Sequence, residues 1–197
     1  MNISGTLNAF RALLSPTLLL PQSTIPTFAS LPLPLSSAFP PHPSTSKPPK
    51  ILGVVLDKDN CFALPHTSTI HAPYTPLFAS LRTHYPRTLL IVSNTAGASS
   101  ADPSGRLAEE LERNTGVPVL RHRTKKPGCG DEIMRYFRGL GEGIERPDQV
   151  AVVGDRLFTD VLMANMMGAW GVWIRDGVRK EDLGLVSLAG VDEGARG

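Results

Sequence analysis

Two carboxylates one residue apart, Asp57 and Asp59, directly follow a short apolar run at 51–56. A run of this length that ends abruptly in polar residues is typical of a strand buried on both faces of a parallel sheet. Side chains two positions apart on an extended backbone point the same way, so both acids can face one mouth of the sheet. Two such carboxylates repel, which favours a bound cation or a raised pKa. The pair therefore predicts either a metal-assisted nucleophile site or an ordinary polar turn, in which Asp is common.

Polar side chains of other kinds follow three more apolar runs, at 88–92, 117–120 and 150–153. They are Ser93 and Asn94, then Lys126 with Lys125 beside it, and finally Asp155 and Asp160. A parallel sheet gathers the carboxyl ends of its strands at one edge, so we expect these groups to meet the acid pair. Together they would provide an oxygen nucleophile, hydrogen-bond donors, a cation, and carboxylates that can hold Mg²⁺. This combination is typical of phosphoryl transfer.

From residue 50 onward, apolar runs of strand length alternate with amphipathic stretches of helical spacing, and a last apolar run lies at 169–174. This alternation predicts an α/β fold with a Rossmann-like, doubly wound parallel sheet. The stretches from Asp59 to Ser93 and from Asn94 to Lys126 are too short for a separate cap domain, which needs about 50 residues for a core of its own. We therefore expect no cap, or a minimal one, and an open mouth at the sheet edge.

Residues 1–49 differ in composition from the rest of the chain, because they contain no Asp or Glu and hold more than half of the 18 prolines. Such a stretch cannot build a packed core by itself. Ile3, Leu7 and Phe10 recur at helical spacing before Pro16, so the start resembles an organelle-targeting segment, a membrane-surface segment or a disordered tail. The apolar run that follows is broken by prolines and is too short to span a bilayer, which takes about 20 apolar residues.

The composition limits the class of protein. A chain of 197 residues, 41% of them hydrophobic, suits one globular domain, expected at 50–178, between the acid-free segment 1–49 and a polar tail at 179–197. A formal net charge of +2 gives no reason to expect nucleic acid as a partner. The only two cysteines, Cys61 and Cys129, cannot form a disulfide framework or a cysteine-rich zinc site.

The order of the motifs resembles that of the haloacid dehalogenase superfamily of aspartyl phosphatases: an Asp-x-Asp pair, a hydroxyl, a lysine, and a Gly-Asp stretch with a second acid. By this resemblance Asp57 would attack phosphorus to form an aspartyl-phosphate. Asp59 would act first as general acid and then as general base. Ser93 would hold the phosphoryl group together with the Asn94 backbone, and Lys126 would neutralise nucleophile and phosphate.

The same resemblance implies a Mg²⁺ site. Asp57, Asp155 and the main-chain carbonyl of Asp59 would bind the ion, and Asp160 would support the site from outside.

Four stretches together, DKDNCFA, SNTAG, KKPGC and GDRLFTDVLMAN, are similar to the mitochondrial phosphatidylglycerophosphate phosphatases of fungi. This resemblance implies hydrolysis of the terminal phosphomonoester of phosphatidylglycerophosphate, in the synthesis of cardiolipin. It also implies peripheral membrane contact at the matrix face of the mitochondrial inner membrane. Arg121, Arg123 and Lys125 would then meet the second phosphate of the substrate or anionic lipid headgroups. The polar stretch 179–197 departs from that family, in which a further apolar, basic helix is expected.

Alternatives remain open from the residues alone. Within the enzyme class, the site suits a phosphatase of a soluble phosphometabolite. In another class, a Mg²⁺-binding, phospho-accepting receiver module uses similar groups, although its accepting Asp follows the third strand and its acid pair the first. Either Lys125 or Lys126 could be the essential lysine. For His122, an exposed loop position is favoured over contact with phosphate.

Overall fold

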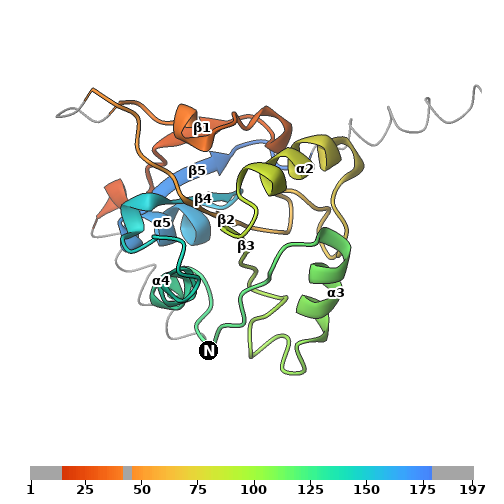
Figure 1. The fold of residues 1–197 in the computed structure, drawn as a ribbon. Coiled ribbons are helices and arrows are strands. Elements are labelled where there is room, and N and C mark those ends of the chain that lie inside the picture. The colour runs from red at the N-terminus through yellow and green to blue at the C-terminus, as the bar shows by residue number, and fades with distance from the viewer. Residues whose placement is uncertain (1–14, 42–45, 179–197) are drawn as a thin grey trace, which may run out of the picture.

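The structure, a computed structural model, describes residues 15–41 and 46–178 (Figure 1). The strands are β1 (Ser23–Ile25), β2 (Gly53–Leu56), β3 (Leu89–Ile91), β4 (Val150–Gly154) and β5 (Trp170–Ile174). The α-helices are α2 (Thr75–His84), α3 (Arg106–Thr115), α4 (Gly130–Gly139) and α5 (Leu162–Met167). Short 3-10 turns lie at Pro16–Leu19, Phe28–Ser30, Leu35–Ala38, Ala72–Tyr74 and Pro147–Gln149, and a π-helical turn lies at Leu157–Val161.

The five strands run parallel in one sheet with the order β1-β5-β4-β2-β3. The chain passes outward from β2 to β3 and then returns to β4 on the other side of β2, so the strand order reverses at β2. Residues that leave the carboxyl end of β2 therefore enter the crevice in which sheets of this kind bind their ligands. The expected doubly wound α/β class is confirmed.

The structure describes residues 15–41 of the amino-terminal stretch, and these are called the N-terminal segment below. This segment contributes one strand to the sheet. Its strand β1 pairs with β5, with Ser23 opposite Val172. The side chains of Phe28 and Leu35 are fully buried in the shared core. This differs from the expected separation of residues 1–49 from the domain: the segment has too few apolar residues for its own core, but enough to cover a sheet that other segments supply. The helical pattern expected before Pro16 and the tail 179–197 lie outside the described residues.

Alternate residues of β2 enter two different cores, because successive side chains of a strand point to opposite faces of the sheet. Val54 and Leu56 share a core with Phe78 of α2 and with the N-terminal segment. Val55 lies in the second core, with Phe137 of α4. Figure 1 shows α2 and the part of the N-terminal segment that follows β1 on one side of the sheet, and α4 and α5 on the other. The turn Pro16–Leu19 lies beside α5, where Asn165 Nδ2 donates to Leu18 O at 2.8 Å. This double burial accounts for the unbroken apolar run before Asp57.

The stretch 117–120 forms only one isolated bridge to the sheet, from Val119 to Ile91 of β3. It was expected to be a third, weaker strand. Pro118 has no N–H to donate, so it interrupts the ladder that a strand here would need. The neighbouring bonds persist, with Ile91 N donating to the Pro118 carbonyl at 2.9 Å and Leu120 N donating to Ile91 O at 2.9 Å. This stretch still leads residues 121–126, called the basic segment below, to the sheet edge, where His122 bridges Ala98.

The two intervals considered for a cap hold helices that pack into the core. Phe78 and Leu81 of α2 and Leu111 of α3 are buried in the core that includes β2. In the described ranges, no helix is both long and apolar enough to cross a bilayer.

Candidate active site

A buried ion-pair group lies where the chain leaves β2. The Nζ of Lys126 is 2.6 Å from Asp57 Oδ1 and 2.7 Å from Asp160 Oδ1. Asp57 is held in place by its own N–H, which donates to Val153 O of β4 at 2.9 Å. All three side chains are buried, and they come from the end of β2, the basic segment and the π-helical turn after β4. The structure thus brings together three of the four groups that the strand ends were expected to supply.

The lysine of this group is firmly charged. Burial lowers the pKa of Lys126, but the charges of Asp160 and Asp57 and their hydrogen bonds raise it further, to a value above the ordinary one. Its neighbour Lys125 is half-buried and makes no ion pair with these acids in the described chain. Of the two candidate lysines, Lys126 is the one that meets the nucleophile candidate.

Three carboxylates form a possible metal site. One oxygen from each of Asp57, Asp155 and Asp160 lies within 4.8 Å of the others. Asp155 Oδ1 is buried without a hydrogen-bond partner in the part of the chain that the structure describes, and Arg156 Nε is 3.9 Å away. Burial and the charge of Asp57 raise the pKa of Asp155, and they raise that of Asp160 to about 7. Crowded acids with an unpartnered oxygen fit a hard divalent cation such as Mg²⁺.

Contacts with the backbone hold the Asp160 side chain in place. Besides Lys126, its carboxylate accepts a hydrogen bond from the backbone N–H of Arg156 at 3.1 Å. The backbone of Gly154 passes so close that a Cβ there would lie 2.3 Å from Asp160 Cγ. A residue larger than glycine would therefore push this acid out of reach of Lys126.

The loop after β3 carries Ser93, which is buried, and Asn94. Ser93 Oγ lies 2.9 Å from Thr95 Oγ1 and accepts a hydrogen bond from Thr95 N at 3.2 Å. The Asn94 side chain binds the backbone of Lys126. Its Oδ1 accepts from Lys126 N at 2.7 Å and its Nδ2 donates to Lys126 O at 3.3 Å. Asn94 thus positions Lys126 through its side chain, a contact that the sequence analysis did not anticipate.

Asp59 is held by two donors. Its Oδ1 accepts from Lys58 Nζ at 2.5 Å and from the backbone N–H of His66 at 2.9 Å. Lys58 is itself buried and also donates to Thr67 O at 2.8 Å. These bonds fix the orientation of the carboxylate that was expected to act as acid and base.

Asn60 is a site residue that the sequence analysis missed. Its Nδ2 donates to Asp155 Oδ2 at 3.0 Å, and its Oδ1 accepts from Val178 N at 3.1 Å. Its backbone is left-handed, with φ 59°, a conformation that Asn tolerates better than most residues. Asn60 lies three residues after the nucleophile candidate, in a polar turn, and this position could have indicated a role in the site.

His122 is buried, not exposed as expected. Its ring nitrogens lie 2.8 Å from Thr124 O and 2.9 Å from Ser93 O. The ring therefore ties the basic segment to the Ser93 loop through backbone groups. Nothing in the pattern of a single loop histidine predicts that its side chain is buried.

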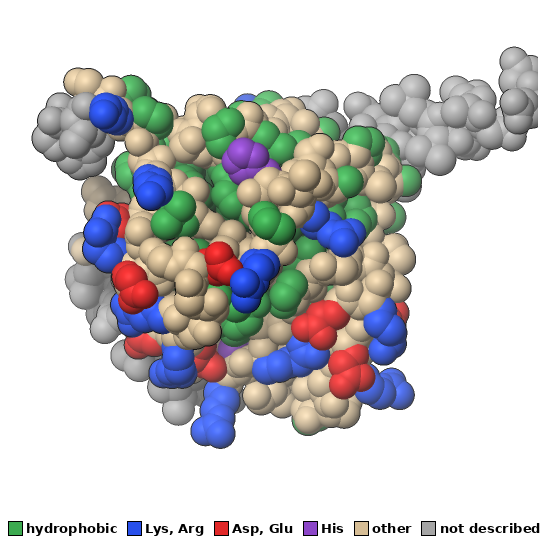
Figure 2. Space-filling model, in the orientation of Figure 1, with side chains coloured by type: hydrophobic (Ala, Val, Ile, Leu, Met, Phe, Trp, Pro, Cys, Tyr) green, Lys and Arg blue, Asp and Glu red, His purple; other side chains and the backbone are tan. Residues whose placement is uncertain are grey.

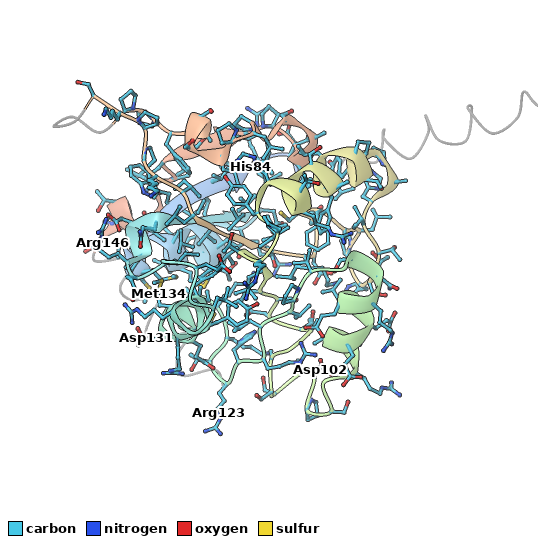
Figure 3. All side chains as sticks on the ribbon, viewed as in Figure 1. His84, Asp102, Arg123, Asp131, Met134 and Arg146 are labelled. Atoms are coloured by element: carbon cyan, nitrogen blue, oxygen red, sulfur yellow. The ribbon has the colours of Figure 1, made fainter. Side chains whose placement is uncertain are left out.

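The two arginines before Lys126 are not gathered at the site. The guanidinium of Arg121 binds Glu112 of α3 at 2.9 and 3.0 Å and also donates to Val119 O at 2.7 Å. Arg123 is exposed and points away from the body of the protein (Figure 3). On the face seen in Figure 2, acidic and basic side chains are interspersed. The expectation that Arg121 meets the second phosphate does not fit its pairing with Glu112.

Comparisons with known proteins identify the family of the chain. The family model described as mitochondrial PGP phosphatase matches residues 3–179. The chain is 53% identical over 180 residues to phosphatidylglycerophosphatase GEP4, mitochondrial, of Saccharomyces cerevisiae, a match that covers 91% of this chain and 90% of that protein. It is 32% identical over 179 residues to the probable mitochondrial phosphatidylglycerophosphatase of Schizosaccharomyces pombe, covering 90% and 84%.

A solved haloacid dehalogenase-like hydrolase from Brucella suis matches at 20% identity with a TM-score of 0.27, covering 91% of this chain and 65% of that one, a likeness too small to carry an argument. The family match spans all of the described residues and includes every motif at the carboxyl edge of the sheet. It therefore favours a phosphatase over a receiver module and confirms the resemblance seen in the four motifs. The chain belongs to the mitochondrial PGP phosphatase family.

Proposed function

We propose that this protein hydrolyses the terminal phosphomonoester of phosphatidylglycerophosphate to phosphatidylglycerol and phosphate. The observation that carries the proposal is the Lys126 ammonium, 2.6 Å from Asp57 and 2.7 Å from Asp160 at the carboxyl edge of β2. A buried carboxylate beside a fixed cation can attack phosphorus while the cation offsets the developing negative charge. The substrate is supported by the names of the yeast relatives.

The reaction would run in two steps. Asp57 attacks the terminal phosphorus, the bond from phosphorus to the glycerol oxygen breaks, and Asp59 gives its proton to that oxygen. Asp59 then takes a proton from water, and the water attacks the aspartyl-phosphate, releases phosphate and restores Asp57. Ser93 and the backbone of Asn94 hold the phosphoryl oxygens in both steps.

We also propose a Mg²⁺ site made by Asp57, Asp155 and the main-chain carbonyl of Asp59, with Asp160 in support. When bound, the ion would offset charge on the phosphoryl oxygens. This assignment is supported by Asp155 Oδ1, which is buried and has no hydrogen-bond partner among the described residues.

Removal of divalent ions is expected to abolish turnover, and Mg²⁺ is expected to restore it. Because the ion offsets the repulsion among three carboxylates, Mg²⁺ should also raise the temperature of thermal unfolding of the enzyme without substrate. This rise should shrink in Asp155→Asn and persist in Asp131→Asn, which changes an exposed acid of α4. Full activity after exhaustive chelation would contradict the metal assignment.

The substrate assignment predicts that kcat/KM for phosphatidylglycerophosphate in mixed micelles exceeds that for soluble sugar and nucleotide phosphates. The reason is the open mouth, since α2 and α3 pack into the core and build no separate cap in the described ranges. Phosphate release across the three substrate classes measures the difference. Equal or better turnover of a soluble phosphate would assign the enzyme to soluble metabolites instead.

We propose that the protein is mitochondrial and lies peripherally on the matrix face of the inner membrane. Arg123 and Lys125 are the basic residues of the segment that remain available to anionic headgroups, because Arg121 is paired with Glu112. Alkaline carbonate is expected to release the protein from mitochondrial membranes. Extraction by detergent alone would contradict peripheral attachment.

A further inference from the structure

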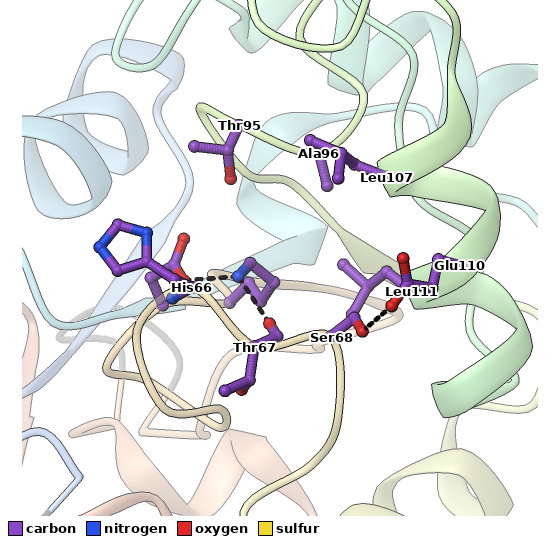
Figure 4. A pocket seen from close by; sticks show the side chains of 10 residues that line it. His66, Thr67, Ser68, Thr95, Ala96, Leu107, Glu110 and Leu111 are labelled. Atoms are coloured by element: carbon purple, nitrogen blue, oxygen red, sulfur yellow. Dashed lines mark hydrogen bonds and ion pairs between the residues drawn. The ribbon is translucent and has the colours of Figure 1, made fainter.

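A cavity of about 260 Å³ lies beside Asp59, outside the ion-pair group (Figure 4). Asp59 and Lys58 line one end of it. Thr95, from the Ser93 loop, lines it as well. The other end is lined by Ser68 and by Glu110 of α3, which contact each other. The cavity is therefore continuous with both the proposed acid and the proposed phosphate loop.

The direction of the proposed reaction places the leaving alcohol on this side. In an in-line displacement the leaving oxygen lies opposite the nucleophile, Asp57, and next to the acid that protonates it, Asp59. Thr95 Oγ1 is 2.9 Å from Ser93 Oγ. The cavity therefore lies next to the hydroxyl that would hold the phosphoryl group. The carbon attached to the leaving oxygen would enter the cavity.

The lining suits a small neutral polyol. Leu107, Leu111 and Ala96 supply an apolar wall for methylene groups, and Figure 4 shows Ala96 and Leu107 together across the cavity from Thr67. Hydroxyl and carboxylate oxygens of Ser68 and Glu110 supply acceptors for hydroxyl groups.

The charges of the lining disfavour a second phosphate. The cation of Lys58 is already bound by Asp59 Oδ1 and Thr67 O, so it is not free to bind an anion. Glu110 adds a negative charge at the far end. A phosphodiester placed here would meet the carboxylates of Asp59 and Glu110, and the lysine of the lining is already bound.

We propose that this cavity binds the glycerol of the leaving group through its free hydroxyl, with Ser68 and Glu110 as specificity-determining residues, while the phosphodiester stays outside the cavity. Asn114 holds the arrangement, since its Nδ2 donates to Ser68 O at 3.0 Å and to Ser68 Oγ at 3.1 Å. The proposal rests on the proposed function and names the part of its substrate that the site recognises.

The test compares two soluble substrates that differ only in the secondary hydroxyl that the leaving glycerol keeps free, 2-hydroxypropyl phosphate and n-propyl phosphate. The purified full-length enzyme should prefer 2-hydroxypropyl phosphate in kcat/KM by about tenfold, the effect of a hydrogen bond to a charged acceptor. Glu110→Ala should reduce that ratio towards one, and Ser68→Ala should reduce it partly. Glu109→Ala is the matched control, because Glu109 is an exposed acid on the same helix and does not line the cavity.

The outcomes separate this proposal from the function on which it rests. A wild-type enzyme that hydrolyses phosphatidylglycerophosphate but shows no preference between the two soluble substrates would overturn the glycerol subsite alone. An unchanged ratio in Glu110→Ala would do the same, provided that thermal unfolding shows the variant to be folded. An enzyme without lipid phosphatase activity would overturn the proposed function first.

Discussion

Replacement of Asp57 by Asn is expected to abolish turnover, with a loss of about 10⁴-fold or more in kcat. An amide oxygen cannot act as the nucleophile that an aspartyl-phosphate requires. The fold should persist, because Asn has nearly the same shape and Lys126 keeps its ion pair with Asp160 at 2.7 Å. Steady-state phosphate release and thermal unfolding measure the two effects. Acid quenching during turnover should trap phosphate on the wild-type chain and not on the variant.

The control for this change is Asp148→Asn. Asp148 is an exposed acid whose carboxylate pairs with the exposed Arg146 at 2.9 Å, so the same chemical substitution there should leave turnover near wild type. Substantial activity in a verified Asp57→Asn preparation would end the covalent mechanism. Phosphate trapped on that variant would show that another side chain is the nucleophile.

Replacement of Lys126 by Met is expected to lower kcat by about 10²-fold or more, because it removes the fixed cation at the reacting phosphate. It should also destabilise the fold by about 3 kcal/mol, since two buried carboxylates lose the lysine cation that they share. Asp57 and Asp160 both bind Lys126 Nζ, so one substitution breaks two ion pairs. Urea unfolding and phosphate release report the two effects separately.

Lys125→Met is the matched control for that substitution. It removes the neighbouring charge from a half-buried side chain that makes no ion pair with Asp57 or Asp160 in the described chain, so stability should stay near wild type. A greater loss of turnover from Lys125→Met than from Lys126→Met would reverse the assignment of the essential lysine.

The meeting of the strand-end residues was predictable because it depends on one local property, the buried apolar run before each polar turn. Asp57, Lys126 and Asp160 are far apart in sequence, yet parallel pairing of β2 with β4 forces two of them to one edge. The pattern of apolar residues contains that information. No knowledge of side-chain contacts was needed.

Contacts between side chains were not predictable in the same way. The pairing of Arg121 with Glu112 depends on how α3 packs beside the basic segment, and no sequence spacing encodes it. The burial of His122 depends on two backbone carbonyls that the fold brings within reach. Such contacts follow from tertiary packing, so the sequence predicted Arg121 at the second phosphate or at lipid headgroups and His122 in solvent.

The strand β1 also sets a limit on proteolytic maturation. Gln22, just before it, donates its backbone N–H to Gly171 O at 3.1 Å, and Gly171 N donates back to Gln22 Oε1 at 2.6 Å. A maturation protease that cut at the composition change near residue 50 would remove an edge strand and uncover the core that Phe28 and Leu35 fill. An import presequence compatible with this fold must therefore end upstream of Gln22, whereas the proline-rich stretch continues to residue 49.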